Sequence, residues 1–391
     1  MFDFRQIVAL GRKRLGFLIG AGGPADLQVN RTTGQLDECG DPLIPTVAPL
    51  TTAVLAALPP DFEPAIAAIR HRSATPFIED ILSMTRGLSQ VLGSAEVEGL
   101  DGHGYTRLSE RICDEIGRIV DVVLPESANA FTELIGWIGG TERAHPVEIF
   151  TTNYDLLFEQ AFERLRLPYF DGFVGAATPF FDPSTVSTND LPARWARLWK
   201  LHGSLGWSID GHNMVVRGKP GSKNHLIYPE HLKYDQIQKA PYASLFERLH
   251  RFLIMPDTLL VVSGFSFADA HVSSRIDEAL AANPAASVFA FQYAALSNEP
   301  YAAALARRRA NFSVFAPDGA IVNCVEAQWR LGQLPSREWD AVRSSYWESG
   351  QSEQPQFLLG RFSALARFFA FSRSEQFVPK PAQPIEEPDS S

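Results

Sequence analysis

Residues 16–23 read Gly-Phe-Leu-Ile-Gly-Ala-Gly-Gly, an apolar run that ends in a glycine-rich turn. A short apolar run bounded by glycines is typical of a strand that is buried in a sheet. Glycine has no Cβ, so the backbone of such a turn can approach a pyrophosphate and direct its N–H groups at the oxygens. Gly20, Ala21 and Gly22 are therefore candidate ligand-binding residues, although the same turn occurs in folds that bind no nucleotide.

Further strands and helices are predicted on the C-terminal side of this turn. β-like runs occur at 147–152, 198–201, 258–263, 286–291 and 312–315. Helical patterns lie at 62–71, 76–92, 105–124 and 128–138. Strands that alternate with helices form mainly parallel sheets. We therefore predict an α/β fold, with a Rossmann-like, mainly parallel sheet and a helical insertion or second module at about 62–140.

The domain organisation follows from the same pattern. We predict one nucleotide-binding domain over residues 1–295, a strand and helical extension over 296–376, and a disordered tail rich in Pro, Glu and Ser over 377–391. Residues 171–193 and 208–224 are expected to form long loops. Aromatic residues at helical spacing over 355–373 predict a docking helix. Packing on its own domain is the simpler interpretation of that helix, and self-association stays open.

Composition excludes several classes of protein. The chain has 391 residues, 45% of them hydrophobic and 20% charged, as in ordinary globular enzymes. Its formal net charge is −10 and it has no dense Lys/Arg block, so direct binding to nucleic acid is not expected. Three widely spaced cysteines form neither a zinc motif nor a disulfide framework. This cysteine pattern fits a reducing cytoplasm, and with no apolar run of about 18 residues we expect a protein that does not enter membranes.

A second motif, Thr151-Thr152-Asn153-Tyr154-Asp155, follows the predicted strand at 147–152. Polar residues there stand at the carboxyl end of the sheet, where open α/β folds bind their ligands. Asn153 and Asp155 could address one carboxamide or ribose. The alternative is that one of them caps the following helix.

A third motif, Lys200-Leu201-His202-Gly203-Ser204, follows the next strand. Histidine has an ordinary pKa of about 6.5, so it can act as a general base near neutral pH. A lone histidine is more often structural than catalytic. The adjacent glycine, which permits close approach of a ligand, favours a catalytic role for His202.

A fourth motif runs from Ser263 to His271 as Ser-Gly-Phe-Ser-Phe-Ala-Asp-Ala-His, after a strongly apolar strand. Gly264 and Ser266 fit a second turn that binds phosphate or ribose. Asp269 fits an N-cap of the helix predicted at 270–281 at least as well as a ligand contact. His271 is interpreted as structural.

In this order, the four motifs resemble the sirtuin-like NAD-binding domain, in the branch found in bacterial antiphage defence proteins such as the Sir2 subunit of Sir2–HerA systems. The resemblance covers about residues 10–295. It implies that NAD is the substrate, that His202 is the base, and that Asn153 and Asp155 lie near the nicotinamide ribose and carboxamide. The residues that it implies for binding NAD are Gly20, Ala21, Gly22, Thr152, Gly264 and Ser266.

Departures from the sirtuin deacetylases narrow the expected activity. Those enzymes have a serine after the glycine turn, then a Pro-Asp-Phe-Arg motif, and a zinc module with two Cys-x-x-Cys pairs. This chain has Pro24 in place of the serine and neither of the other two features. We therefore expect no metal, no acyl-lysine channel, and water as the acceptor of the ADP-ribosyl group.

These departures favour an NAD glycohydrolase, and the resemblance implies that it depletes NAD in antiphage defence. One alternative is an NAD-dependent protein deacylase or ADP-ribosyltransferase, in which a group other than water accepts the ADP-ribosyl group. Another is a non-catalytic sensor of NAD or ADP-ribose, which would not need both Asn153 and His202. An enzyme that drains NAD requires control, and few residues remain for a sensor domain. We therefore expect a homo-oligomer that binds a partner, with a HerA-type DNA-translocating ATPase as the partner that the resemblance implies.

Overall fold

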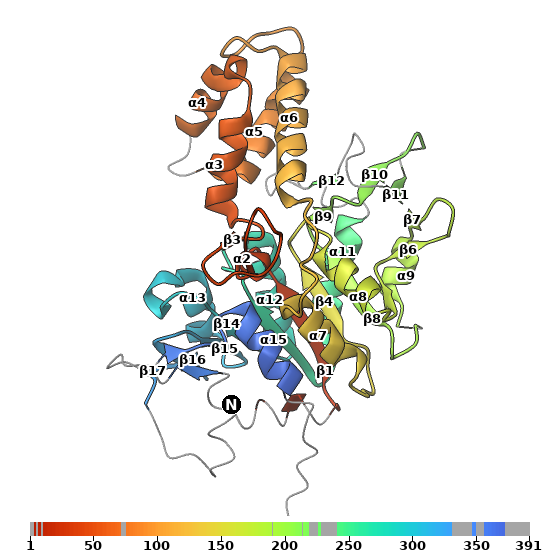
Figure 1. Ribbon diagram of the computed structural model, residues 1–391, viewed down its shortest axis with the longest axis vertical. Helices are drawn as coiled ribbons and strands as arrows, with labels where there is room; N and C mark the ends of the chain where they lie inside the picture. Colours follow the sequence, from red (N-terminus) through yellow and green to blue (C-terminus); the bar gives the residue numbers. More distant parts are fainter. Residues whose placement is uncertain are drawn as a thin grey trace, which may run out of the picture.

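The computed structural model describes residues 4, 7–8, 11–71, 76–189, 191–212, 214–218, 226–227, 241–330, 346–348 and 356–371. Its centre is a nine-stranded sheet (Figure 1). The strands of this sheet are β1 (Arg14–Ile19), β4 (Glu148–Thr151), β5 (Tyr169–Phe170), β8 (Ala196–Lys200), β13 (Thr258–Ser263), β14 (Ser287–Phe291), β15 (Phe312–Phe315), β16 (Gly319–Val322) and β17 (Val325–Gln328). Their spatial order is β17-β16-β15-β14-β13-β1-β4-β8-β5.

All the strands from β5 across to β15 pair in parallel, whereas β16 and β17 add an antiparallel edge. The predicted α/β fold with a mainly parallel, Rossmann-type sheet is confirmed. The order reverses at β1, which has β4 on one side and β13 on the other. In parallel sheets such a reversal opens a crevice at the carboxyl ends of the strands, where ligands bind.

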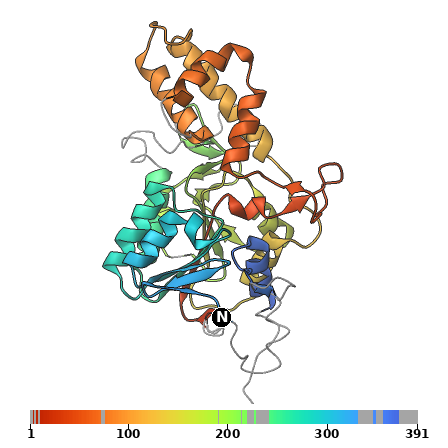
Figure 2. The same cartoon turned by 90° about the vertical axis from the view of Figure 1, so that its left-hand side faces the viewer.

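Helices cover both faces of the sheet (Figure 2). One face packs against α7 (Ala130–Gly139), α8 (Leu157–Arg164) and α15 (Phe362–Phe371), and the other against α11 (Tyr242–Ile254), α12 (Ala270–Ala282) and α13 (Pro300–Arg308). Successive side chains of a strand point to opposite faces, so Phe17 and Ile19 of β1 enter the first core and Leu18 enters the second. Because both faces are covered, the central strands are apolar without alternation.

A helical module projects from the carboxyl end of the sheet (Figure 1). It consists of α3 (Val47–Ala57), η1 (Pro60–Phe62), α4 (Glu63–His71), α5 (Ile78–Val91) and α6 (Gly102–Val120). The module thus begins before the predicted start at residue 62. It also excludes α7, which contacts α15 on the sheet. The sequence of α3 gave no helical signal because its apolar residues are not confined to one stripe.

The segment after residue 295 is continuous with the sheet domain. Strand β15 extends the parallel order, and α15 lies on the same face as α7. Phe369 packs against Phe17 and Trp137 with ring centroids 5.2 and 4.8 Å apart. The aromatic face of this predicted docking helix is therefore buried in its own domain, as the simpler interpretation held. The predicted tail at 377–391 lies outside the described residues.

The remaining elements are short. The predicted loops at 171–193 and 208–224 contain a small sheet of β6 (Phe173–Val174), β7 (Phe180–Phe181), β10 (Trp207–Ile209) and β11 (Val215–Arg217), together with α9 (Pro183–Ser187). The others are α2 (Gly22–Ala25), η2 (Leu296–Asn298), β2 (Gln28–Val29), β3 (Asp41–Pro42), β9 (Gly203–Ser204), β12 (Leu226–Ile227), β18 (Trp347–Glu348) and β19 (Gln356–Phe357). Among the described helices, no single one is long and apolar enough to cross a membrane. Only α3 and α4 taken together have the length and composition of a membrane span, and the chain bends by 113° between them.

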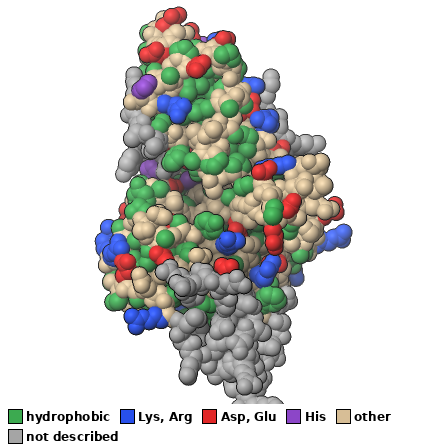
Figure 3. Space-filling model, turned by 60° about the vertical axis from the view of Figure 1, so that its left-hand side comes forward, with side chains coloured by type: hydrophobic (Ala, Val, Ile, Leu, Met, Phe, Trp, Pro, Cys, Tyr) green, Lys and Arg blue, Asp and Glu red, His purple; other side chains and the backbone are tan. Residues whose placement is uncertain are grey.

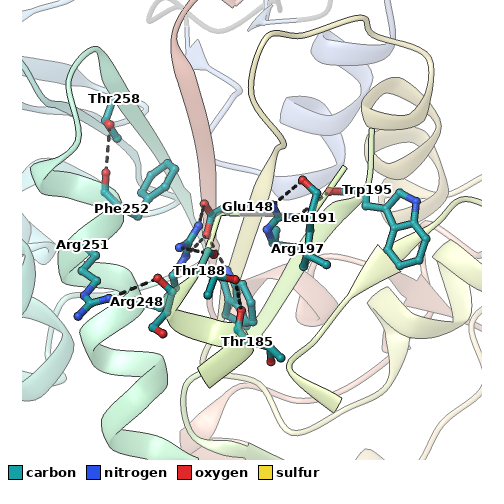
Figure 4. A network of polar contacts seen from close by, with 12 residues as sticks. Glu148, Thr185, Thr188, Leu191, Trp195, Arg197, Arg248, Arg251, Phe252 and Thr258 are labelled. Atoms are coloured by element: carbon teal, nitrogen blue, oxygen red, sulfur yellow. Dashed lines mark hydrogen bonds and ion pairs between the residues drawn. The ribbon is translucent and has the colours of Figure 1, made fainter. Parts of the chain in front are cut away.

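A buried ion pair joins α11 to the amino-terminal end of β4, at the end of the sheet opposite the ligand-binding edge (Figure 4). Glu148 accepts hydrogen bonds from Arg248 Nε at 2.8 Å and from Trp199 Nε1 at 2.7 Å. A second nitrogen of Arg248, Nη2, contacts the other carboxylate oxygen. The side chains of Arg248 and Glu148 are 1% and 4% exposed, so the pair is screened very little by water.

Candidate functional site

The four sequence motifs meet at the carboxyl edge of the parallel sheet. The glycine turn follows β1, Thr152 and Asn153 follow β4, His202 follows β8, and Gly264 follows β13. Backbone hydrogen bonds join the second and third motifs, because Leu201 N donates to Thr151 O at 2.8 Å and Leu205 N donates to Tyr154 O at 3.0 Å. The structure therefore brings together segments that are far apart in the sequence.

The two glycine turns pack directly against each other. Gly20 N donates to Ser263 O at 3.1 Å, and Gly22 N donates to Gly264 O at 2.9 Å. A Cβ on Gly22 would lie 2.6 Å from Gly264 Cα, and one on Gly264 would lie 2.5 Å from Gly23 N. Glycine is thus required for the contact between turns, whereas the sequence had indicated only close approach of a pyrophosphate. Ala21, Gly22 and Gly264 stay partly exposed at the edge.

Gly264→Ala is expected to destabilise the protein more than Gly34→Ala. Both glycines have positive φ, at +65° and +68°, but a Cβ on Gly34 would meet nothing within 4 Å. The shared conformational penalty is about 1–2 kcal/mol, and the clash at Gly264 should add about 1–3 kcal/mol. Urea unfolding of the two variants measures the difference. Equal losses of stability would show that the two turns do not pack as described.

Asn153 spans from β4 to the glycine turn. Its Nδ2 donates to Gly20 O at 3.1 Å, and its backbone N–H donates to Thr151 Oγ1 at 3.1 Å. Thr151 Oγ1 in turn donates to Ile19 O at 2.8 Å, so a chain of hydrogen bonds fixes the start of the motif on β1. Asn153 and Thr152 are partly exposed, as a ligand-binding role requires.

Asp155, by contrast, lies below the surface of the site. It is 4% exposed, and its Oδ1 accepts a hydrogen bond at 3.0 Å from N–H of Leu157, the first residue of α8. Burial raises the pKa of the Asp155 carboxyl, and the charge of Lys200 partly opposes this rise. Asp155 thus bonds the first N–H of α8 from the position before the N-cap, Leu156, which is close to the capping role that the sequence left open. This role argues against the predicted contact between Asp155 and a carboxamide.

A second acidic group lies behind the site beside Lys200. Lys200 Nζ is 3.2 Å from Glu159 Oε1 and also contacts Asp155 O. Burial raises the pKa of Glu159 to about 7, although Lys200 acts in the opposite direction. This pair was not predicted from the sequence, because Glu159 has the pattern of an ordinary helical glutamate. The contact holds the strand end that precedes His202 against α8.

The imidazole of His202 lies against the carboxylate of Asp269. His202 Nε2 lies 2.8 Å from Asp269 Oδ2, and each side chain is 9% exposed. The other oxygen of Asp269 accepts from N–H of His271 at 2.8 Å and of Val272 at 3.1 Å, which caps α12. Burial alone would raise the pKa of Asp269, but the hydrogen bond and charge of His202, with these two N–H groups, lower it. The sequence predicted the cap and missed the pairing.

The loop from Gly264 to Asp269 is held in a strained conformation. Phe267 has φ of +61°, which is unfavourable for a bulky residue. Its ring is buried against Phe265 and Phe312, with centroids 5.0 and 5.2 Å apart. Ser273 Oγ also donates to Phe267 O at 2.8 Å. Strain that is maintained in this way is concentrated at functional sites. Here it leaves Ser266 exposed and turns Asp269 inward.

A hydrogen bond joins the helical module to the site. Tyr154, between Asn153 and Asp155 in the second motif, donates its hydroxyl to Glu79 Oε1 at 2.7 Å. Glu79 lies in the first turn of α5. The module is thus attached to the loop that carries Asn153. Among the described residues, no group of three or more His, Cys, Asp or Glu side chains is arranged to hold a metal ion.

Comparisons with known proteins find two similar solved structures and one family model. One solved structure is described as "Structural Basis for the Mechanism and Regulation of Sir2 Enzymes"; it is 15% identical, and the match covers 74% of this chain and 83% of the other. The second is a Sir2 homologue in complex with NAD; it is 11% identical, and the match covers 80% of this chain and 88% of the other. Both have a TM-score of 0.34, which is too low to equate individual positions. No curated protein matches the chain. Residues 147–314, which contain three of the four motifs, match the family model described as SIR2-like domain.

Proposed function

We propose that this protein hydrolyses NAD to nicotinamide and ADP-ribose at the site that contains Asn153 and His202. The main support is the placement of the His202–Asp269 pair at the edge of the parallel sheet where such folds bind dinucleotides. The similarity of residues 147–314 to the SIR2-like domain agrees with a reaction that uses NAD.

The exposed parts of the site fit a dinucleotide. Ala21, Gly22 and Gly264 present backbone without bulky side chains, which allows a diphosphate to approach closely. Thr152 and Ser266 place hydroxyl groups at neighbouring loops, where they could bind ribose or phosphate oxygens. These residues would hold NAD, and Gly20 would support the turn from beneath.

The chemistry requires that the bond between C1′ and the nicotinamide nitrogen breaks and that water adds to C1′. The bonding electrons leave with nicotinamide, which departs as a neutral molecule. His202 would accept the proton that the attacking water loses, and would later return it to solvent. Asn153 would hold the ribose or the water in line with C1′, which lowers the entropic part of the barrier.

An NAD-dependent deacylase or ADP-ribosyltransferase is the alternative with the same substrate. It differs only in the group that accepts the ADP-ribosyl moiety. Incubation with NAD and an acetyl-lysine peptide separates the two. We expect nicotinamide release at the same rate with and without the peptide, and no acetyl transfer. Release that depends on the peptide would establish the alternative, and NAD binding without release would indicate a sensor.

We predict that the reaction needs no zinc, because the sequence lacks paired cysteines. Dialysis against a zinc chelator should leave both the NAD-cleavage rate and the melting temperature unchanged. Stoichiometric zinc that is lost together with activity on chelation would contradict this expectation. Zinc added back after dialysis provides the control for damage caused by the chelator.

We further propose that the protein acts in the bacterial cytoplasm, in antiphage defence, as a homo-oligomer with a HerA-type DNA-translocating ATPase. Phe368 and Phe369 of α15 are buried and are not available to an interface, whereas Phe371 at the end of the helix is exposed. Figure 3 shows hydrophobic side chains gathered on the helical module, where Phe77 and Val91 are exposed. Mass photometry with and without the ATPase should show a multimer and a larger complex. A monomer whose NAD-cleavage rate is the same with and without the ATPase would contradict this proposal.

A further inference from the structure

The contact between His202 and Asp269 determines which ring nitrogen of the histidine carries a proton. Oδ1 of Asp269 accepts from two backbone N–H groups, and the buried Oδ2, which accepts no other hydrogen bond among the described residues, lies 2.8 Å from His202 Nε2. These partners stabilise the ionised carboxylate, which can accept hydrogen bonds but cannot donate them. A hydrogen bond across this 2.8 Å contact requires a proton on Nε2. In the neutral ring, Nδ1 then carries the lone pair.

We propose that Asp269 is a positioning residue that holds His202 as the Nε2–H tautomer and makes Nδ1 the basic nitrogen of the site. The proposal rests on the proposed hydrolysis of NAD, in which His202 accepts a proton. Asp269 itself does not touch the substrate. It acts through His202, by fixing the tautomer and orientation of the ring and by stabilising the imidazolium that forms when the ring gains a proton.

Asp269 is rigid enough for this role. As the N-cap of α12, it is attached to a helix of 13 residues that is packed on the sheet. On its N-terminal side, the buried ring of Phe267 holds the loop in its left-handed conformation. Gln292 Nε2 adds a buried hydrogen bond to Phe265 O at 3.1 Å. The Asp269 carboxylate is thus held in place from both its N-terminal and its C-terminal side. An N-cap residue on a mobile loop would lack this support.

Asp269→Asn tests the tautomer directly. Asparagine caps helices about as well as aspartate, so α12 should persist. The two backbone N–H groups need an acceptor, so the amide oxygen must take the place of Oδ1. The NH2 group is then directed at His202 Nε2, which must become the acceptor and give its proton to Nδ1. The variant therefore keeps the shape of the site and reverses the tautomer.

Two measurements follow on the full chain. We expect kcat for nicotinamide release to fall about 100-fold or more, with KM within about threefold, since the wrong tautomer of a positioned histidine blocks proton transfer and leaves binding intact. Nitrogen NMR of 15N-histidine-labelled protein, with the His202 signals assigned by their loss in His202→Gln, should show a protonated Nε2 in the unmodified protein. It should show a protonated Nδ1 in Asp269→Asn.

The matched control is Asp101→Asn, which makes the same change at another N-cap. Asp101 Oδ1 accepts from Gly104 N at 2.6 Å at the start of α6, in the helical module. This variant should keep the wild-type kcat and tautomer. A protonated Nδ1 in the unmodified protein, or a kcat for Asp269→Asn equal to that of Asp101→Asn, would overturn the proposal. If the unmodified protein releases no nicotinamide, the proposed function fails, whereas the NMR signals still decide the tautomer without NAD. They also decide it if Asp269→Asn does not fold.

Discussion

His202→Gln is expected to release nicotinamide from NAD about 10²- to 10⁴-fold more slowly than the unmodified protein, which is the usual contribution of a general base. Glutamine retains an N–H donor that can bind the Asp269 carboxylate, so the buried charge keeps a partner. It has no group that accepts a proton near neutral pH. The loss should therefore appear in kcat while the melting temperature changes little.

Three companion measurements make this result specific. His103→Gln removes an exposed histidine of α6 and should leave the rate unchanged. Asn153→Ala should also abolish cleavage, because it removes the amide that extends from β4 to the glycine turn. His202→Ala should lose activity to the same extent and should cost more stability, since it leaves Asp269 without this partner. Wild-type turnover by either His202 variant would rule out its role as the base.

Arg248→Met is expected to lower the free energy of unfolding by about 3–5 kcal/mol, because removing one member of a buried ion pair leaves an uncompensated charge. Glu148 would retain the indole N–H of Trp199 as a partner and would lose both contacts with the guanidinium. Methionine fills a similar volume, so the effect reports on charge more than on a cavity. Equilibrium unfolding in urea measures it.

The matched control is Arg251→Met, on the same helix. Arg251 pairs with Glu247 at 3.1 Å, but these side chains are 44% and 50% exposed. An exposed pair contributes about 0–1 kcal/mol, so this variant should unfold close to the wild-type urea concentration. The double variant Glu148→Gln with Arg248→Met should regain part of the lost stability. Equal effects of the two arginine variants would contradict the description of Glu148 and Arg248 as a buried pair.

The strands and turns that build the site could be predicted because their signals are local. An apolar run followed by Gly20, or by Thr152 and Asn153, shows both the strand and its polar end. Strand β17 gave no such signal, because Val325–Gln328 is a stretch of only four residues with no apolar run, and all four are exposed. The aromatic stripe of α15 predicted a packed helix, but periodicity does not say which surface receives it.

The chemistry of the site was less predictable because it depends on contacts between distant segments. His202 follows β8 and Asp269 follows β13, two strands that do not pair with each other. An N-cap pattern accounts for one carboxylate oxygen of Asp269 and says nothing about the second. For the same reason, glycine patterns could not show that Gly22 and Gly264 face each other. Asp155 could be interpreted either as a ligand contact or as a cap, because both roles favour the same residue types.

The most direct test of the account is the fate of NAD incubated with the purified full chain, alone and with a candidate ATPase. Chromatography would follow NAD, nicotinamide and ADP-ribose over time, with Asn153→Ala and His202→Gln as inactive references. We predict that nicotinamide and ADP-ribose appear in equal amounts as NAD disappears, in at least one of the two conditions, and that neither variant forms them. NAD that stays intact in both conditions, or products formed equally by the variants, would contradict the assignment of an NAD-cleaving site to Asn153 and His202.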